Sequence, residues 1–270
     1  MIMEKSQWFR VSKENPCPIC KKQDWCTLSK DVACCMRVQS KTFAKNGGWI
    51  HKLSDDAPKY VPQAKREEIK IDVKSIYQKW NNETKPDSLK GFAELLKLEV
   101  MALCLLGCAW APESEAFAFP MMDERCQTIG IRLRNVYGKK WAVKGSKQGI
   151  FIPEIEFTKR LYIVEGPTDT AAALSLGFSV IGRPSCLGCE EMILQFIDIQ
   201  KIKEVVIIAD NDDVGIRGAE KLRSMLKVPS CLLIPPCKDV REFLQLGGTK
   251  EVLESMIKSL VWMVPKTILK

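Results

Sequence analysis

Acidic side chains follow two apolar segments of this sequence at spacings that suit metal chemistry. Residues 161–164 precede Glu165, and residues 205–209 precede Asp210, with Asp212 two positions later. Carboxylates held close together repel one another unless one of them takes up a proton or a cation lies between them. Magnesium suits such a site because it binds few protein oxygens and leaves positions for phosphate oxygens. The pattern therefore indicates phosphoryl transfer on nucleotides or nucleic acid, with Mg²⁺ or Mn²⁺ as the metal.

The apolar segments are predicted to be buried β-strands that alternate with helices. Gly166 turns the chain after the first strand, and Thr168 and Asp169 begin an Ala-rich helix. This alternation predicts a parallel sheet, whose strands have their carboxyl ends at one edge. Glu165 and Asp210 both fall at that edge. Taken singly, each acidic group could instead be only a helix cap or a charged turn.

The order and spacing of the acids resemble the TOPRIM domain, which bacterial-type primases, topoisomerases and some nucleases share. Residues 165–169 read E-G-x-x-D, residues 210–215 read D-x-D-x-x-G, and Lys238-Asp239 follows a further strand. The similarity covers residues 158–248. It departs from the family pattern at Arg241, where members often carry another acid.

The TOPRIM resemblance implies roles for these acids. The implied catalytic residues are Glu165, Asp169, Asp210 and Asp212. The implied magnesium ligands are Glu165, Asp210, Asp212 and Asp239. Glu165 would act as a general base or order the metal site, and Asp169 would brace the site from the start of its helix.

Cysteines cluster near the N-terminus, where five of the 12 in the chain are found. The sequence begins with no secretory signal, so the thiols are expected to stay reduced and to favour metal binding over disulfides. Cys17 and Cys20 form a knuckle, and Cys26 and the pair Cys34-Cys35 follow. Residues 15–53 are therefore predicted to fold around a tetrahedral zinc ion.

This segment resembles the N-terminal zinc module of phage and plasmid primases. In that family a cysteine just before an M-R or R-R pair is typical, which favours Cys35 as the last ligand and leaves Cys34 as the alternative. The implied zinc ligands are Cys17, Cys20, Cys26 and Cys35. His51, the only histidine of the chain, could replace Cys26, although a surface role is favoured.

Basic side chains accompany a predicted β-hairpin that precedes the acidic segments. The hairpin comprises residues 116–119 and 128–134, and its second strand alternates apolar with basic residues. Such a face suits a groove for template and triphosphate, although it could also be an ordinary solvated β face. The residues predicted to bind nucleic acid or nucleotide are Arg132, Arg134, Lys140, Lys144 and Arg183.

The hairpin region also resembles the amino-terminal half of a primase catalytic core. Residues 119–123 and 130–134 are similar to its hairpin, and Lys140-Trp141 is similar to the lysine-aromatic step before its TOPRIM domain. Aromatic and basic residues of the N-terminal module could stack on template bases or simply pack that module. They are Trp25, Arg37, Lys41 and Trp49.

The predicted fold class is α/β, or α+β overall. It combines an N-terminal zinc-binding module, a helical and β-hairpin subdomain, and a TOPRIM parallel sheet flanked by helices. The expected segments are the zinc module at 1–53, a linker at 54–71, the N-terminal part of a primase core at 72–157, the TOPRIM domain at 158–248, and a C-terminal helix and tail at 249–270.

Composition narrows the class of protein. The chain has 270 residues, of which 46% are hydrophobic and 27% charged, as expected for a globular protein. Its net charge of +8 favours a polyanionic partner. The longest apolar run, residues 100–111, is too short to span a bilayer, so we expect a cytoplasmic protein with no membrane partner. The sequence contains no Walker P-loop, which argues against a helicase motor of that type.

These resemblances favour a DNA primase that makes short RNA primers on single-stranded DNA from ribonucleoside triphosphates. A phage-type or mobile-element enzyme with a separate replicative helicase is the expected setting. Two alternatives stay open: a TOPRIM-type metal-dependent nuclease, and a non-catalytic zinc and TOPRIM protein that binds DNA in recombination or repair. A topoisomerase is disfavoured because the four tyrosines offer no clear nucleophile.

Overall fold

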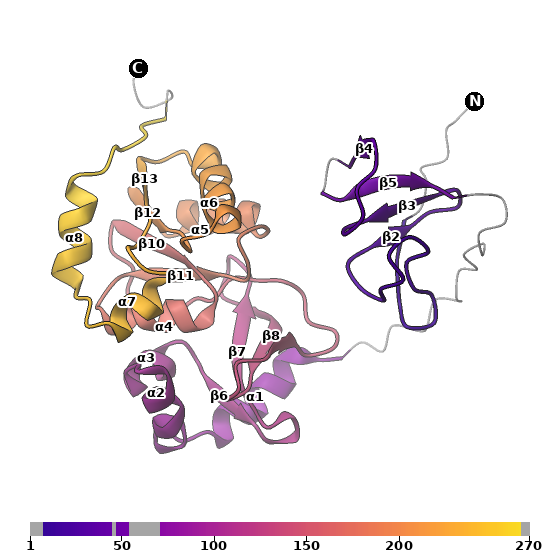
Figure 1. The fold of residues 1–270 in the computed structure, drawn as a ribbon. Helices are drawn as coiled ribbons and strands as arrows, with labels where there is room; N and C mark the ends of the chain where they lie inside the picture. Colours follow the sequence, from indigo (N-terminus) through magenta and orange to yellow (C-terminus); the bar gives the residue numbers. More distant parts are fainter. Residues whose placement is uncertain (1–7, 45–46, 54–70, 266–270) are drawn as a thin grey trace. The chain divides into compact units, whose positions relative to one another are not determined.

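The computed structural model describes residues 8–44, 47–53 and 71–265. The chain forms two compact units, Met1–Glu68 and Ile69–Lys270, which Figure 1 shows with their elements labelled. Apart from residue 71, the predicted linker lies outside the described residues, as do residues 266–270 of the predicted tail. Within the described ranges, every helix is too short or too polar to cross a bilayer.

The first unit is a small antiparallel sheet built around cysteines. Its strands lie in the order β1 (Phe9–Arg10), β2 (Thr27–Leu28), β3 (Val32–Cys35), β5 (Trp49–Lys52) and β4 (Thr42–Phe43). The buried apolar side chains besides the cysteines are Val11, Leu28 and Ala33. A core of this size contributes little stability, so the unit depends on a further constraint such as a metal ion.

The second unit contains a four-stranded parallel sheet with the order β11-β10-β12-β13. Its strands are β10 (Arg160–Glu165), β11 (Val180–Arg183), β12 (Glu204–Ile208) and β13 (Ser230–Leu233). The helices between and after them are α4 (Pro167–Ser175), α5 (Glu190–Ile199), α6 (Asp213–Met225), α7 (Val240–Gln245) and α8 (Lys250–Lys258). The predicted parallel sheet flanked by helices is confirmed.

Both faces of the parallel sheet are buried, which explains its continuous apolar strands. In β10, Tyr162 and Val164 join the hydrophobic cluster that contains α4, α7 and α8. Leu161 and Ile163 point to the opposite face and pack with α5 and α6. Because side chains alternate along a strand, one apolar segment supplies both cores.

A second, antiparallel sheet supplies the basic strands. It has the order β6 (Ala109–Ala111), β7 (Ala116–Met122), β8 (Thr128–Arg134) and β9 (Lys140–Ala142). The helix α1 (Val73–Glu83) covers one face, where it contacts Ile131 and Leu133 of β8. Arg132 and Arg134 therefore lie on the opposite face, paired across the strands with Phe119 and Phe117.

Short backbone contacts join the two sheets. Ile150 forms an antiparallel bridge with Met122 of β7, and the next residue, Phe151, forms one with Gly182 of β11. The helices α2 (Lys90–Leu96) and α3 (Val100–Leu105) pack in the same cluster as α4, so the core is continuous across residues 157 and 158. The antiparallel sheet is thereby held at a fixed position against the parallel one.

Candidate active site and zinc site

The first acidic position lies where β10 passes into α4. Glu165 is the last residue of β10 and is half-buried, and Gly166 turns the chain with φ of 79°. A residue with a side chain would be strained at that φ, which explains the glycine. The Gly166 N–H donates to the carbonyl of Arg183 on the neighbouring strand at 2.7 Å, so the turn is fixed to β11.

The second acidic position lies between β12 and α6. Asp212 caps α6, since its Oδ1 accepts the N–H groups of Val214 at 3.0 Å and Gly215 at 2.7 Å. A Cβ on Gly215 would lie 2.7 Å from the carbonyl oxygen of Asp210, so the glycine of the D-x-D-x-x-G motif permits this close turn. Asp210 is half-buried and Asp212 is exposed.

The third acidic position lies after β13. Asp239 caps α7, its Oδ1 accepting the Glu242 N–H at 2.7 Å, and its Oδ2 lies 3.6 Å from the guanidinium of Arg241. The backbone N–H of Arg241 donates to Asp169 Oδ1 at 3.2 Å, which ties α4 to α7. The loops also meet at the backbone, where Asn211 N–H donates to the Lys238 carbonyl at 2.7 Å.

The acidic edge carries excess negative potential. Burial raises the pKa of Asp210 to about 7, and the carboxylates of Glu165, Asp239 and Asp212 add to the effect. Burial likewise raises the pKa of Asp169 to about 7, with Asp239 the next cause. Burial raises the pKa of Glu165, against which the charge of Arg183 acts. A divalent cation would relieve this potential, so the donor set suits one.

Basic residues of the antiparallel sheet lie opposite this edge. Arg134 is 8% exposed and interacts electrostatically with Asp169 and Asp239. Lys140 pairs with Arg134 across β8 and β9 and is solvent-accessible. Desolvation and the charge of Arg134 lower the pKa of the Lys140 amine, while Asp169 and Asp210 oppose the shift. Cations and carboxylates thus occupy two facing surfaces.

The remaining predicted basic residues have different positions. Arg132 is half-buried and donates to the Pro184 carbonyl at 3.5 Å. Lys144 is exposed in the turn after β9. Arg183 is only 3% exposed, donates to the Gly218 carbonyl at 3.3 Å and lies 3.9 Å from Glu190. These contacts make Arg183 a brace between β11, α5 and α6, and its predicted contact with phosphate stays a prediction.

The four cysteines expected to bind zinc come together in the first unit. The Sγ atoms of Cys17, Cys20, Cys26 and Cys35 all lie within 4.8 Å of one another. Those of Cys20 and Cys26 are 3.7 Å apart, and those of Cys26 and Cys35 are 3.9 Å apart. Four sulfurs about 2.3 Å from a tetrahedral zinc ion would be separated by about 3.8 Å, so the geometry fits zinc.

Backbone and side-chain donors surround the thiols. The Met36 N–H donates to Cys26 Sγ at 3.4 Å, and the Val38 N–H donates to Cys35 Sγ at 3.3 Å. Arg37 lies 3.8 Å from Cys26 Sγ and forms an ion pair with Asp24. These donors would offset the negative charge of a zinc ion bound by four thiolates.

The alternative zinc ligands point elsewhere. The thiol of Cys34 lies 3.5 Å from the carbonyl of Gly47, and His51 Nε2 lies 3.0 Å from the carbonyl of Val38. In β3, consecutive side chains point to opposite faces, so only one of the two adjacent cysteines can face the cluster. The burial pattern agrees, because Cys35 is fully buried and Cys34 is not.

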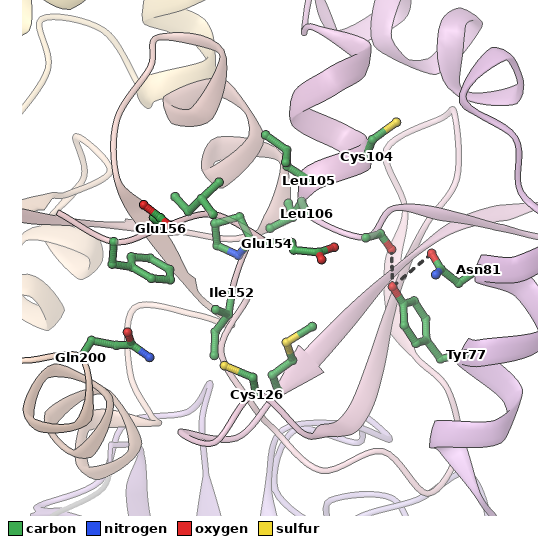
Figure 2. A pocket seen from close by; sticks show the side chains of 15 residues that line it. Tyr77, Asn81, Cys104, Leu105, Leu106, Cys126, Ile152, Glu154, Glu156 and Gln200 are labelled. Carbon is green, nitrogen blue, oxygen red and sulfur yellow. Dashed lines mark hydrogen bonds between the residues drawn. The ribbon is translucent and has the colours of Figure 1, made fainter.

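A separate cavity lies away from the acidic edge. The cavity has a volume of about 620 Å³. Figure 2 shows Glu154 and Tyr77 among its lining residues, with Tyr77 hydrogen-bonded to Asn81 and Gly107. Its lining includes Glu154 and Glu156 but no arginine or lysine. The cavity is therefore poorly suited to phosphate, unlike the surface between the two sheets.

Comparison with known proteins agrees with this arrangement. Residues 162–244 match the Toprim-like family. The fold is similar to the DnaG primase catalytic domain bound to ssDNA, at 14% identity and a TM-score of 0.56 over 70% of this chain and 79% of that chain. It is similar to the primase fragment of the bacteriophage T7 primase-helicase protein, at 15% identity and a TM-score of 0.51 over 59% and 71%.

A further similar structure is the Aquifex aeolicus primase with its zinc-binding and RNA polymerase domains. The identity is 15% and the TM-score 0.56 over 71% of this chain and 61% of that chain. Comparison with curated proteins finds no match for this chain. Residues 162–244 therefore form a Toprim-like domain. The chain has the fold of bacterial and phage primase cores, which confirms the predicted fold class and the family resemblance.

Two residues of this site were not among those predicted from the sequence. Arg241 contacts both Asp169 and Asp239, and its departure from the acidic family pattern was the available signal. Cys186 lines a small hollow together with Glu165 and Asp210. Because it lies far from those acids in the sequence, the sequence did not show that it is close to them.

The cysteine geometry predicts which substitution releases zinc. Cys35→Ser should lose zinc to a chelator under conditions in which the wild-type protein retains it, because a tetrahedral site loses one thiolate. Cys34→Ser is the matched control and should retain one zinc per chain. The measurement is zinc content after chelator challenge. Zinc loss from Cys34→Ser equal to that from Cys35→Ser would contradict the assignment.

The buried carboxyl of Asp169 predicts a pH-dependent stability. Its pKa is about 7 in the folded protein against an ordinary value of 3.8, so its contribution to stability falls as pH rises from about 4 to 7. Above pH 7, the ionised Asp169 lowers the free energy of unfolding by at most about 4 kcal/mol. Asp169→Asn should therefore stabilise the protein more at pH 8 than at pH 5, because its amide oxygen still accepts the Arg241 N–H. Urea unfolding without divalent ions measures this, and parallel pH profiles for the two proteins would argue against it.

Proposed function

We propose that this protein is a DNA primase that synthesises short RNA primers on single-stranded DNA by metal-dependent nucleotidyl transfer. The observation that carries the proposal is the opposition of two charged surfaces within a primase-core fold. Arg134 and Lys140 of the antiparallel sheet face Asp169 and Asp210 of the Toprim-like sheet. Nucleotidyl transfer needs such a pair, because phosphates require cations and the metal ion requires carboxylates.

The basic residues would bind the phosphates. Arg134 is a buried guanidinium whose Nε has no hydrogen-bond partner among the described residues. A buried cationic donor without a partner is costly, and a phosphate oxygen would satisfy it. Lys140 is accessible to solvent beside it and would bind the same triphosphate or the template backbone. Arg132 and Lys144 would extend this surface towards the template.

The acidic residues would serve the reacting end of the primer. A divalent ion bound there would supply Lewis-acid activation of the 3′-hydroxyl and neutralise the departing pyrophosphate. The proposed ligands are Glu165, Asp210 and Asp212. Burial raises the pKa of Glu165. This residue would accept the hydroxyl proton or order the metal site.

The zinc unit is proposed to engage the template. Trp25 is 74% exposed, and the guanidinium of Arg37 lies over its ring at 5.7 Å from the centroid. An exposed aromatic ring beside a cation can stack on an unpaired base and contact the backbone phosphate. The other proposed partners are ribonucleoside triphosphates and a separate replicative helicase, and the proposed setting is a phage or mobile element.

Primer synthesis tests the proposal directly. The zinc-loaded protein would be incubated with a mixed-sequence single-stranded DNA, Mg²⁺ and labelled ribonucleoside triphosphates. The wild-type protein should make short labelled RNA. Asp210→Ala should reduce the yield by about 1,000-fold, equivalent to about 4 kcal/mol of transition-state stabilisation. Asp213→Ala, an exposed acid at the start of α6, is the matched control and should keep activity within about twofold.

Other outcomes would favour the alternatives. Metal-dependent shortening of the template without RNA synthesis would favour a Toprim-type nuclease. Salt-sensitive DNA binding with neither activity would favour a non-catalytic DNA-binding protein. Equal RNA synthesis by wild-type protein and Asp210→Ala would reject the acidic edge as the active site.

A further inference from the structure

We propose that the acidic edge binds a single divalent ion, at Glu165, Asp210 and Asp212, and that Arg241 is a positioning residue that replaces a second ion. The catalytic meaning of this inference rests on the proposed function, whereas the binding of the ion can be measured without it.

Both oxygens of Asp239 already face donors within the protein. Its Oδ1 accepts the Glu242 N–H at 2.7 Å, and its Oδ2 lies 3.6 Å from the Arg241 guanidinium. The residue is only 5% exposed. A metal ion at Oδ2 would compete with the Arg241 guanidinium, and one at Oδ1 would share that oxygen with the α7 cap. The proposal thus removes Asp239 from the ligands that the sequence predicted.

Both oxygens of Asp169 also face donors within the protein. Its Oδ1 accepts the backbone N–H of Arg241 at 3.2 Å, and its Oδ2 lies 3.5 Å from the Thr168 hydroxyl. It is 6% exposed. Arg241 therefore uses its backbone for one buried carboxylate and its side chain for another. This double contact fixes the start of α4 relative to the start of α7.

The other three acids are more accessible. Glu165 and Asp210 are half-buried, and Asp212 is exposed. Asp212 caps α6 through Oδ1 alone, so its Oδ2 is not used by the cap. Their oxygens do not form a group as tight as the four cysteines, which are the one such cluster in the described part of the chain. The carboxylates of Glu165 and Asp212 interact electrostatically with Asp210, so the three acids lie close to one another. A Mg²⁺ or Mn²⁺ ion at this edge would complete its coordination with water.

Arg241 also adds to a group of cations. Its charge disfavours the protonated form of both Arg134 and Lys140, so the three basic groups lie close enough to interact. The Nε atoms of Arg134 and Arg241 are buried and lack hydrogen-bond partners among the described residues. Cations brought together with unused donors are stabilised by an anion. These three basic groups would bind the phosphate groups that a second metal ion would otherwise neutralise.

The count of bound metal ions tests this inference. The zinc-loaded full chain, without DNA or nucleotide, would be titrated with Mn²⁺ while the electron paramagnetic resonance signal of the free ion is measured. The wild-type protein should bind one Mn²⁺ that Mg²⁺ displaces. Arg241→Asp should bind two, because the variant frees Asp239 and adds a carboxylate beside it.

Two further variants make the result specific. Arg125→Asp has the same change of charge at a side chain that is 81% exposed, and it should still bind one ion. Arg241→Ala frees Asp239 without adding an acid, so it should bind a second ion more weakly. This variant tests the inference if Arg241→Asp does not fold. Circular dichroism establishes which variants are folded.

Other counts of bound ions would contradict the inference. Two comparable Mn²⁺ ions in the wild-type protein would show that Arg241 does not replace one, and no bound ion would remove the site. A single ion in every folded Arg241 variant, or a second ion in Arg125→Asp as well, would also overturn it. Failure of primer synthesis with one bound Mn²⁺ would reject the proposed function and leave this inference standing.

Discussion

The carboxylates at the end of the parallel sheet can lie together because cations lie opposite and among them. Lys140 from the antiparallel sheet acts on Asp210, and Arg241 from α7 acts on Asp169. Glu165 and Asp210 lie at the ends of parallel strands, whereas Lys140 belongs to the antiparallel sheet. The backbone bridge from Phe151 to Gly182 therefore matters to the site, because it holds the basic strands against the acidic edge. Phosphate chemistry between the sheets depends on this opposition of charge.

Sequence patterns predicted the parts of the structure that depend on local rules. The strand at residues 160–165 was recognisable because both of its faces are apolar and an acid and a glycine follow it. Alternation in β8 predicted that Arg132 and Arg134 share a face. The knuckle at Cys17 and Cys20 predicted a metal module, and the structure brings the chosen four thiols together. These features depend on periodicity and turn chemistry within short segments.

The sequence could not show which partners each site residue has in three dimensions. Arg183 was predicted to touch phosphate because it lies at a strand end, and the sequence did not show that α5 and α6 enclose it at 3% exposure. Asp169 and Arg241 are 72 positions apart, and their hydrogen bond depends on how α4 and α7 pack. Whether Asp239 is free or occupied depends on the same packing. Burial and capping of this kind follow from tertiary contacts rather than from residue type.

Localised backbone cleavage most directly tests the central claim that the two charged surfaces form one metal-dependent site. Fe²⁺ would replace Mg²⁺ in the zinc-loaded protein, and ascorbate with peroxide would generate radicals at the bound ion. The account predicts cuts near Glu165 and Asp210 and also in the facing strands around Arg134 and Lys140, all suppressed by excess Mg²⁺. Cuts confined to one surface, or insensitive to Mg²⁺, would contradict it.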